Sequence, residues 1–554
     1  MQTPPDRSPP VKDASPSPAA QLVSLDWERI QLIIRLRPLA PPAVSPADLR
    51  LERVDDPAVT VAPMRAWREG DAVVARFNVM LGPAQMPLEP GRWSVALAAP
   101  DHPAGPAVAA VALSIRGLPS IDPAHHGKAF WLRRGRYEVS PALRSPDGML
   151  ELTVRFERGR APWDDGTHWE RIAGVFRSAG LFLKIAVLRL LVSLARSFVR
   201  RNGRRVLFMS DYAAGLTDNL RLVYDRMVER GLDREYELMT LTRPTPHAGR
   251  GPADRLLLPW LLARADAIVI DKDQPVLHRV PSAGHRIVQL WHSSGAIKTV
   301  GYSRIGTPRG PNPWSRTHKD YTYAIVSGEF DIPLYAEAFG IPEERVIPTG
   351  IPRMDRFFDE RARAAGREAA LVAFPEAGGR MVILFAPTFR GSLKEATYDL
   401  GVLDHARLHA LCLEKDAVFV IRLHPFVRRS LDIPDAFADR LLDGSSAVMN
   451  APDLLFATDL LITDYSSIVF EYSTLGRPML FFAHDLDEYR AERDVYVPYE
   501  EFVPGRIVRT FDELVEAIRH DDYELEKVAP FAARHFAHPE GGATDRVIDL
   551  IIGR

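Results

Sequence analysis

The sequence predicts an α/β protein in which two consecutive Rossmann-like halves face a cleft, preceded by an all-β, sandwich-like domain. Apolar runs bounded by turn signals alternate with helical stretches from about residue 205 onward, which is typical of a parallel sheet covered by helices. Two of these runs end at a histidine, His292 in the first half and His424 in the second. Because ligands bind at the carboxyl ends of strands in open α/β sheets, the histidines indicate two domains around one cleft. This layout is the GT-B architecture.

The segment before the two halves has a different pattern. From Leu22 to about Phe156, short alternating runs are broken by Pro, Gly and Asp, which predicts several strands of a β sandwich. Nothing in this segment has a catalytic pattern, so we interpret it as an accessory or interaction domain. The main strands expected along the whole chain are Ile30–Leu36, Ala72–Phe77, Trp93–Leu97, Leu150–Val154, Val206–Ser210, Tyr236–Thr240, Ala267–Ile270, Tyr323–Val326, Met381–Ala386, Leu460–Thr463 and Pro478–Phe482, with one more before each histidine.

Five segments are expected in order. Residues 1–20 are rich in Pro, Ser, Ala and Asp and are predicted to be a disordered tail. The sandwich-like accessory domain covers 21–157, and a basic amphipathic helical linker covers 165–203. The N-terminal half of the GT-B pair, which would bind the acceptor, covers 204–360. The C-terminal half, which would bind a nucleotide, covers 361–554.

Composition limits the class of protein. The chain has 554 residues, 46% of them hydrophobic and 26% charged, which suits several globular domains. Its formal net charge of −2 gives no nucleic-acid signature. The single cysteine, Cys412, excludes an intramolecular disulfide framework, fits a reducing compartment and is predicted to be a core residue. The N-terminus has no positively charged start followed by an apolar stretch, so no secretory signal is predicted.

The segment from Arg171 to Arg205 carries nine Arg or Lys residues and no acid. Its longest charge-free stretch is six residues, whereas a bilayer span needs about 20 apolar residues. A basic amphipathic helix of this kind can lie in the membrane interface, attracted to anionic lipid. The alternative is a long helix that packs on its own protein with a solvated basic face. On a helical wheel one side gathers Arg171, Arg177, Lys184, Arg189, Arg196 and Arg200.

A candidate phosphate site follows the strand that ends at Thr463. Asp464 and the pair Ser466 and Ser467 lead into a helical stretch from Ile468 to Leu475, and a helix N-terminus offers unpaired N–H groups and a positive dipole. The two serines add hydroxyl donors, although they could simply cap the helix. Glu471, one turn further along, could accept hydrogen bonds from a ribose.

Four other residues, at three further strand ends, suit the same chemistry. Thr388 and Arg390 follow another strand end, where Arg390 could neutralise phosphate; a structural turn is the alternative. His292 could be a general base, since an imidazole pKa near ~6.5 suits proton transfer at neutral pH. His424 could donate to a phosphate oxygen. A lone histidine at a strand end more often has a structural role. Its occurrence together with Lys298, the Ser466–Ser467 pair and Arg390 favours a functional site.

No metal and no cofactor are predicted. Two Asp-x-Asp triplets, Asp271–Asp273 and Asp485–Asp487, are interpreted as incidental, because two-Rossmann enzymes usually hold a diphosphate with protein donors. The sequence has no zinc spacing, Walker loop or G-x-S-x-G elbow.

Six motifs in order resemble those of the CDP-glycerol glycerophosphotransferases, which build teichoic acids and related polyol-phosphate polymers. The resemblance runs from about Arg205 to Leu550. One difference is Ser293-Ser294, where many members carry Gly-Thr after the first histidine. The motifs are Gln289–His292 with Gly295, Lys298 and Gly301–Ser303; Thr349–Asp355, which includes Arg353; Ala386–Arg390; Arg422–Pro425; Thr463–Ser467 with Phe470–Tyr472; and Gly542–Val547.

The resemblance implies a reaction and a set of roles. An acceptor hydroxyl would attack the β-phosphate of CDP-glycerol or another CDP-polyol, with CMP leaving and a phosphodiester forming. His292 would take the proton and His424 would stabilise the phosphates. Ser466 and Ser467 would cradle the diphosphate beside Asp464, and Glu471 would hold the ribose. Lys298, Arg353 and Asp355 would contact the acceptor or support the site.

The resemblance also implies partners and a location. The acceptor would be lipid-linked or a glycan, and the enzyme would be peripheral at the cytoplasmic face of the cell membrane, which agrees with the basic linker. Two other functions stay open. One is a GT-B glycosyltransferase that uses a nucleotide sugar, and the other is a non-enzymatic scaffold whose functional part is the β domain.

Overall fold

The structure is a computed structural model that describes residues 20–39, 45–81, 85–97, 109–110, 113–114, 123–132, 135–144, 149–163, 168–211, 213–243, 252–280, 284–308, 310–391, 395–427, 431–445, 451–492 and 495–553. The predicted disordered tail therefore lies outside the described residues, apart from Ala20. The chain forms two compact units. Unit 1 comprises Met1–Ala173 and Gly301–Ser315, and unit 2 comprises Gly174–Val300 and Arg316–Arg554.

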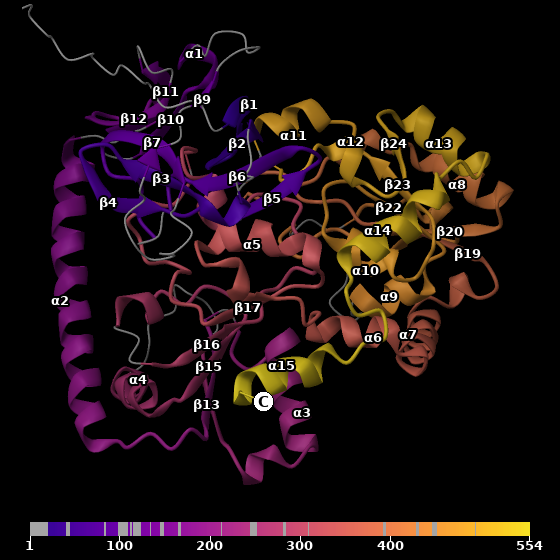
Figure 1. The fold of residues 1–554 in the computed structure, drawn as a ribbon. Coiled ribbons are helices and arrows are strands. Elements are labelled where there is room, and N and C mark those ends of the chain that lie inside the picture. Colours follow the sequence, from indigo (N-terminus) through magenta and orange to yellow (C-terminus); the bar gives the residue numbers. More distant parts are fainter. Residues whose placement is uncertain are drawn as a thin grey trace, which may run out of the picture. The chain divides into compact units, whose positions relative to one another are not determined.

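Unit 1 is built from two sheets whose strands are mostly antiparallel (Figure 1). One sheet has the order β5-β6-β2-β1-β9, and the other has the order β10-β11-β12-β7-β3-β4 with β8 beside β7. Buried side chains such as Leu32, Phe77, Trp93 and Val154 form a single core. The elements are β1 (Ala20–Glu28), β2 (Gln31–Pro38), β3 (Leu49–Arg53), β4 (Asp56–Val61), β5 (Arg65–Glu69), β6 (Ala72–Asn78), β7 (Gly91–Leu97), β8 (Ala109–Ala110), β9 (Leu113–Ser114), α1 (Pro123–His126), β10 (Lys128–Leu132), β11 (Gly135–Arg144) and β12 (Met149–Arg158).

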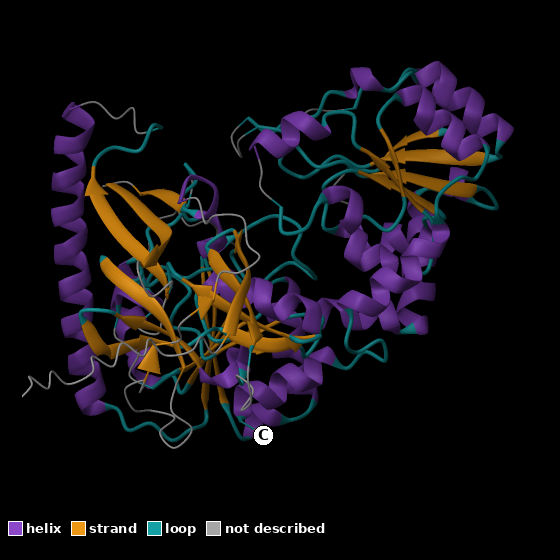
Figure 2. Cartoon of the chain, turned by 45° about the horizontal axis from the view of Figure 1, so that its top comes forward, coloured by secondary structure: helices purple, strands orange, loops and turns teal. Residues whose placement is uncertain are grey.

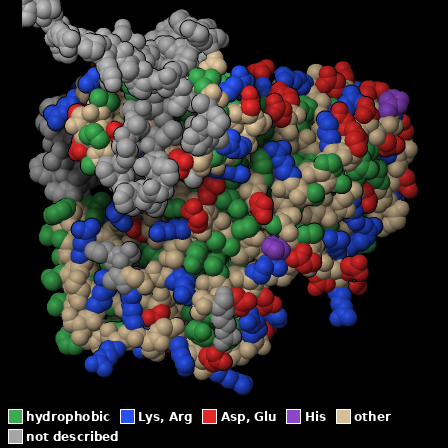
Figure 3. Space-filling view, in the orientation of Figure 1, with side chains coloured by type: hydrophobic (Ala, Val, Ile, Leu, Met, Phe, Trp, Pro, Cys, Tyr) green, Lys and Arg blue, Asp and Glu red, His purple; other side chains and the backbone are tan. Residues whose placement is uncertain are grey.

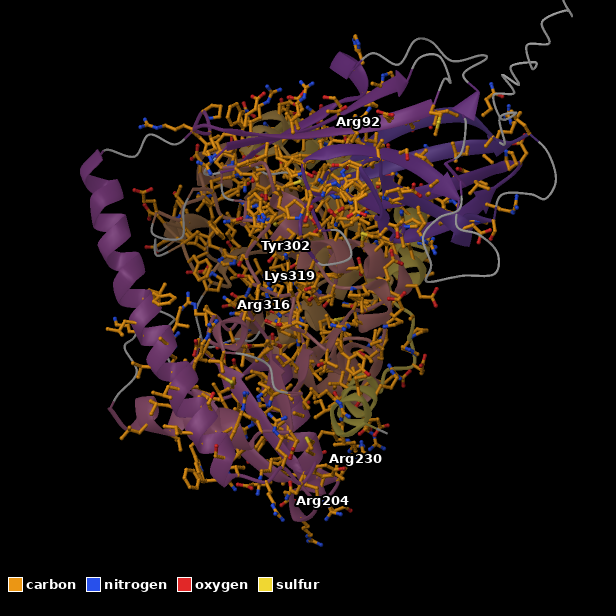
Figure 4. The ribbon with its side chains drawn as sticks, turned by 60° about the vertical axis from the view of Figure 1, so that its left-hand side comes forward. Arg92, Arg204, Arg230, Tyr302, Arg316 and Lys319 are labelled. Atoms are coloured by element: carbon orange, nitrogen blue, oxygen red, sulfur yellow. The ribbon has the colours of Figure 1, made fainter. Side chains whose placement is uncertain are left out.

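Residues 301–315 form an excursion from the first Rossmann-like half into unit 1. The sequence predicts this stretch as part of the 204–360 domain. It joins unit 1 because Tyr302 (labelled in Figure 4) and Ile305 are buried in the core of that unit. The Tyr302 hydroxyl donates to the Ser315 carbonyl at 2.7 Å, which ties the two ends of the excursion together.

The first half of unit 2 is a six-stranded parallel sheet in the order β14-β13-β15-β16-β17-β18. The central strands β13 and β15 are short and mostly apolar, as expected where helices cover both faces. The elements are α2 (His168–Phe198), β13 (Arg205–Ser210), α3 (Asp218–Glu229), β14 (Glu237–Thr242), α4 (Pro252–Arg264), β15 (Ala267–Ile270), β16 (Arg286–Gln289), β17 (Tyr323–Ile325), α5 (Ile332–Phe339), β18 (Val346–Ile347), α6 (Asp355–Phe358) and α7 (Glu360–Ala373).

The second half is also a six-stranded parallel sheet, in the order β21-β20-β19-β22-β23-β24, with helices on both faces (Figure 2). The strand order reverses between β19 and β22, so the ends of these two strands form a topological switch point. The predicted α/β class is thus confirmed for unit 2. The elements are β19 (Met381–Phe385), α8 (His405–Glu414), β20 (Ala417–Ile421), β21 (Leu441–Asp443), α9 (Ala451–Ala457), β22 (Leu460–Thr463), α10 (Ile468–Ser473), β23 (Met479–Phe482), α11 (Leu486–Glu492), α12 (Tyr499–Phe502), β24 (Arg506–Val508), α13 (Phe511–Arg519), α14 (Val528–His535) and α15 (Ala543–Ile552).

The C-terminal helix α15 returns to the first half of unit 2 and packs against α3. Asp545 on α15 pairs with Arg226 at 2.9 Å and with Arg230 at 3.2 Å, and Figure 4 shows Arg230 beside this helix. One hydrophobic core runs through both halves, from Val206 on β13 to Ile551 on α15. Cys412 is buried in a core of the second half, as predicted, and burial raises the pKa of its thiol to about 12.

The basic helical segment is a single long helix, α2, whose described side chains run from residue 180 onward; those of Arg171 and Arg177 lie outside the described set. Two of the basic residues on the predicted side contact other parts of unit 2. Arg189 donates to the Arg279 carbonyl at 2.7 Å, and Arg196 lies 3.2 Å from His285. The outward side carries an apolar stripe instead, visible as a column of hydrophobic side chains in Figure 3. Its members, each 38–82% exposed, are Leu183, Val187, Leu190, Leu191, Leu194 and Phe198.

Among the described residues, none of the helices has the length and apolar content that a membrane span requires.

Candidate functional site

A cleft of about 640 Å³ lies between the two halves of unit 2, a size that suits a nucleotide-sized ligand. Both halves line it: the start of α3 and the loop around Arg353 on one side, and α9, α10 and the loop at His424 on the other. Three guanidinium groups and two hydroxyls give it the character of an anion site. The lining residues are Asp218, Arg221, Leu222, Arg353, Arg356, Phe357, His424, Ala451, Pro452, Leu455, Ser466, Ser467, Ile468 and Glu471.

Glu471 joins the two halves at the floor of this cleft. Its Oε1 accepts hydrogen bonds from the Ser294 hydroxyl at 2.9 Å and from the guanidinium of Arg353. Its Oε2 is buried and has no hydrogen-bond partner among the described residues. A buried carboxylate oxygen without a donor is costly, so this atom is suited to accept a hydrogen bond from a bound ligand.

A buried amide, Asn219, aligns the two loops of the first half. Its Nδ2 donates to the Trp291 carbonyl at 3.0 Å, and its Oδ1 accepts the Arg353 N–H at 3.0 Å. Asn219 is wholly buried at the start of α3. It thereby fixes the position of the residue before His292 relative to the Arg353 loop.

His292 follows a residue with unusual backbone geometry. Trp291 has φ of +53°, in the left-handed region that bulky side chains rarely adopt, and its N–H donates to Gln289 Oε1 at 2.8 Å. The indole contacts His292, Phe339 and His318, with ring centroids 4.5 to 6.4 Å away. The surrounding contacts thus hold a strained turn directly before His292.

The pKa of His292 is lowered to about 4, first because the surrounding protein desolvates the charged ring, and further because of the positive charges of Lys272 and Arg353. His292 as a whole is nevertheless an exposed residue, so the ring can exchange protons with solvent. His292 is therefore neutral at pH 7 and able to accept a proton. It does not line the cleft itself, but Ser294, two residues further along, donates to Glu471 in the cleft lining.

A pH profile of kcat/KM measures this property. If neutral His292 is the base, activity requires the unprotonated ring, so it is lost as the pH falls through the pKa of the folded protein. We expect the acid limb of kcat/KM to lie near pH 4 instead of near ~6.5, the ordinary histidine value. An acid limb at the ordinary value would show that the ring is not desolvated in the free enzyme.

The loop after His292 is pressed against the second half. A Cβ atom on Gly295 would lie 2.2 Å from the ring of Phe470, so only glycine fits there. Further along, the Ile297 carbonyl accepts the Tyr496 N–H at 3.0 Å, and Lys298 forms a β-bridge with Val495. The Lys298 ammonium lies 5.5 Å from the Tyr489 ring centroid. The His292–Lys298 loop is therefore part of the junction between the two halves.

His424 lines the cleft from the second half, as expected for the end of β20. Burial lowers its pKa, and the charge of Lys298 lowers it further. Its Nδ1 accepts the Phe426 N–H at 3.2 Å, and its ring packs between Phe389 and Phe426. With Nδ1 occupied as an acceptor, Nε2 is the atom that carries the proton and can donate to a ligand.

Asp464 and Thr388 lie at the switch point between β19 and β22. Asp464 Oδ1 accepts the backbone N–H groups of Thr388 at 2.7 Å and of Tyr465 at 2.6 Å. Arg390 donates to Asp464 Oδ2 at 2.9 Å and makes a bidentate pair with Asp485. The Arg390 guanidinium is thus directed at two carboxylates and does not line the cleft; in this arrangement it braces the turn that carries the serines.

Ser466 and Ser467 both line the cleft. Ser467 is the N-cap residue of α10, which ends at Ser473 and so is shorter than the sequence predicts, and it makes no side-chain capping bond. Ser466 Oγ accepts the Ile468 N–H at a long 3.4 Å. Capping of the helix therefore occupies these two hydroxyls only weakly, and both can still bond to a ligand.

Asp355 lies away from the cleft and caps the C-terminal helix. Its carboxylate accepts the N–H groups of Ala543 at 2.7 Å and Thr544 at 2.9 Å, and the Thr544 hydroxyl at 2.6 Å. The Arg546 guanidinium donates to the Thr349 carbonyl at 2.8 Å. These contacts place the motif at 349–355 against the motif at 542–547 and give Asp355 a supporting position.

Four residues of the site are missed by the sequence analysis: Asp218, Asn219, Arg221 and Arg356. The first three begin an ordinary amphipathic helix, and their pattern gives no sign that the cleft lies above them. Arg356 directly follows the motif that ends at Asp355, and this adjacency is the one signal that could have found it. Arg356 pairs with Asp453 from the second half.

Neither Asp-x-Asp triplet forms a metal site. Among the residues that the structure describes, no group of three or more His, Cys, Asp or Glu side chains could hold a metal ion. Asp485 is paired with Arg390, and Asp271 accepts a long hydrogen bond from Ser210 at 3.5 Å.

Comparisons with known proteins converge on one family. The sequence model described as CDP-Glycerol:Poly(glycerophosphate) glycerophosphotransferase matches residues 191–553. The teichoic acid ribitol-phosphate polymerase TarL of Staphylococcus aureus is 39% identical over 387 residues, which cover 70% of this chain and 69% of TarL. TarK from the same organism, also a teichoic acid ribitol-phosphate polymerase, is 41% identical over 358 residues, 64% of this chain and 69% of TarK.

A solved structure of the wall teichoic acid polymerase TagF matches with a TM-score of 0.54 over 70% of this chain and 98% of the TagF chain. The sequence identity is 21%, so this likeness shows the fold alone.

Proposed function

Because the chain belongs to the CDP-glycerol:poly(glycerophosphate) glycerophosphotransferase family, as its motifs predict, we propose that it transfers a polyol phosphate from a CDP-polyol to an acceptor hydroxyl. CMP leaves, and the product is a phosphodiester in a teichoic-acid-like or capsular polymer. The two halves of unit 2 act as a GT-B pair, the first for the acceptor and the second for the nucleotide. The observation that carries this proposal is the cleft between the two halves, lined by His424, Ser466, Ser467 and three arginines.

The donor diphosphate would lie in the cleft. Arg221, Arg353 and Arg356 neutralise its charge, and the hydroxyls of Ser466 and Ser467 donate to its oxygens. Glu471 Oε2, which has no protein donor among the described residues, accepts a ribose hydroxyl. Phosphoryl transfer is mostly positioning and charge stabilisation, so a site of this composition is sufficient without a nucleophilic side chain.

In the chemical step the acceptor oxygen bonds to the β-phosphorus. His292, neutral because of its lowered pKa, takes the hydroxyl proton. The bond between the β-phosphorus and the bridging oxygen breaks, and CMP carries that oxygen away. His424 donates through Nε2 to a phosphate oxygen and stabilises the charge that develops as the bond breaks. Thr388, Arg390 and Asp464 maintain the turn beneath the serines.

The polyol is proposed to be ribitol. TarL and TarK, at 39% and 41% identity, are ribitol-phosphate polymerases, whereas the glycerol-phosphate primase of Bacillus subtilis is 27% identical. The glycerol donor of the family name is the alternative substrate.

Product analysis tests the reaction and the donor together. The full chain is incubated with vesicles that carry a lipid-linked acceptor and with CDP-ribitol, CDP-glycerol or a panel of nucleotide sugars. We expect acceptor-dependent CMP and a new phosphodiester, with kcat/KM for CDP-ribitol at least about tenfold above CDP-glycerol, since a site built for extra hydroxyls rejects a donor that lacks them. A nucleoside diphosphate with a new glycoside would instead establish a glycosyltransferase, and equal rates would refute the ribitol preference.

The enzyme is proposed to be peripheral at the cytoplasmic face of the membrane, held there by α2. The apolar stripe of this helix is unusual for a surface helix, and a lipid interface is a surface on which such a stripe is stable. The basic residues support this indirectly: Arg189 and Arg196 fasten α2 to unit 2, so the apolar side faces out.

Flotation with anionic vesicles measures this attachment. We expect the double variant Leu190→Glu/Leu194→Glu to lower the vesicle-bound fraction about tenfold or more, because each charge must be removed from the apolar interface. Leu413→Glu is the matched control, since Leu413 on α8 is 52% exposed and Leu194 is 51% exposed. Equal flotation of the double variant and the wild type would refute attachment through α2.

A further inference from the structure

A second cavity lies wholly within unit 1, among residues to which the proposed chemistry gives no role. Its volume is about 1180 Å³, larger than that of the cleft in unit 2. Four aromatic side chains line it: Trp131 on β10, Phe156 on β12, Trp163 after β12 and Trp314 on the 301–315 excursion. Arg158 and Asn312 add polar groups.

The four aromatic rings are not fully buried, although Phe156 also packs against the core of unit 1. Trp314 is 43% exposed, and Trp131, Phe156 and Trp163 are partly exposed. The rings of Phe156 and Trp314 meet edge to face, with centroids 6.0 Å apart and an interplanar angle of 77°. Exposed tryptophans grouped at a concave surface are uncommon in soluble domains and mark binding sites.

The excursion that carries Trp314 is rigidly held. Tyr302 anchors its start in the core and bonds to Ser315 at its end. A Cβ atom on Gly310 would lie 1.9 Å from the Arg304 carbonyl oxygen, so the chain folds tightly on itself there. The backbone N–H of Trp314 donates to Asn312 Oδ1 at 3.0 Å. A half-exposed tryptophan on a loop that is held in place by such contacts indicates a preorganised binding surface.

We infer that this cavity is a saccharide-binding site, with the rings of Trp314 and Trp131 as platforms for the apolar face of a pyranose. The C–H groups on one face of such a ring meet the negative face of an aromatic ring, while its hydroxyls need polar partners at the edge. Asn312 and Arg158 supply a carbonyl acceptor and a guanidinium fork for those hydroxyls.

The inference rests on the proposed function only for the source of the ligand, which would be a sugar of the acceptor glycan or of the growing polymer. The binding site is chemically separate from polyol-phosphate transfer. A saccharide bound in unit 1 would keep the acceptor on the enzyme between successive additions, without taking part in the chemical step.

Binding without turnover tests the site. The labelled full chain is applied to an array of bacterial mono- and oligosaccharides, and the retained sugar is then titrated against the protein by calorimetry. We expect retention by wild type, a roughly tenfold weaker Kd for Trp314→Ala, and recovery of most of the affinity in Trp314→Phe, because a stacked ring supplies a comparable increment. Trp260→Ala is the matched control: Trp260 on α4 is 41% exposed and lies outside the cavity.

Three outcomes would overturn the inference: no saccharide retained, affinity unchanged in both Trp314→Ala and Trp131→Leu, or retention of free nucleotides in place of sugars. Circular dichroism melting identifies a variant that fails to fold, and Trp131→Leu then replaces it. CMP release from CDP-ribitol is measured separately on the same samples. Loss of transfer with intact sugar binding would refute the proposed function alone, and the reverse would refute this site alone.

Discussion

Replacing His292 with alanine is expected to lower kcat for polyol-phosphate transfer by about 10²- to 10⁴-fold, the usual contribution of a positioned general base. The reason is geometric as well as electrostatic. The strained turn at Trp291 precedes His292, and the lowered pKa of the ring keeps it neutral at pH 7. Single-turnover release of CMP measures the chemical step directly.

Measuring the affinity of His292→Ala for CDP distinguishes the loss of a general base from a failure of the variant to fold. Because His292 does not line the cleft, the Kd for CDP is expected to change less than about threefold, within the usual effect of a substitution outside a binding site. His409→Ala is the control for removal of a histidine, since His409 on α8 pairs with Asp439 at the surface. A His292→Ala enzyme with wild-type kcat would eliminate this residue as the base.

Replacing Arg390 with leucine is expected to destabilise the second half of unit 2 by about 3–5 kcal/mol, the usual cost of removing one partner from a buried ionic group. Asp464 has 1% of its side-chain surface exposed, and Asp485 has 20%. Without Arg390, both carboxylates lose their cation. Urea denaturation measures the free energy of unfolding, and faster amide exchange at Thr388 and Tyr465 would report the loosened turn.

Arg407→Leu is the matched control. Arg407 pairs with Asp512 at the surface, with side chains 47% and 77% exposed, so its loss should cost less than about 1 kcal/mol. Equal losses in the two arginine variants would refute a special role for the buried network.

The same network gives a pH dependence. Burial raises the pKa of Asp485, but the stronger effect of pairing with Arg390 lowers it overall. A carboxyl whose pKa is lower in the folded state stabilises the protein above its unfolded pKa, and this contribution is lost as the pH falls through the acid range. Arg390→Leu removes the favourable pairing, so the variant should lose less stability than wild type on acidification.

Local patterns were sufficient for the elements and for part of the site. Each strand expected in the two halves of unit 2 occurs within a few residues of its predicted bounds, because buried strands of a parallel sheet are read from continuous apolar runs. Strand ends also located Ser466, Ser467 and His424, which all line the cleft. These residues could be located because all strands of a parallel sheet end at the same edge, where ligands bind.

Contacts between distant segments decided the rest. The sequence suggests Arg390 as a phosphate ligand. In the structure its guanidinium pairs instead with Asp464 and Asp485, which lie 74 and 95 residues further along the chain. The sequence places residues 301–315 in a Rossmann-like half, but Tyr302 is buried in the core of unit 1. The helical wheel of the basic segment could not tell that Arg189 and Arg196 would contact other parts of unit 2.

The sequence by itself determined the α/β class, the family and the strand-end residues, since each depends on local periodicity or on the order of short motifs. Only the tertiary structure decided that Asn219 ties Trp291 to Arg353, that Glu471 bridges the halves, and that four aromatic rings meet in unit 1. The physical reason is that a buried polar group must be satisfied and an apolar face must be covered by whatever segment the fold brings near. A sequence pattern does not specify that segment.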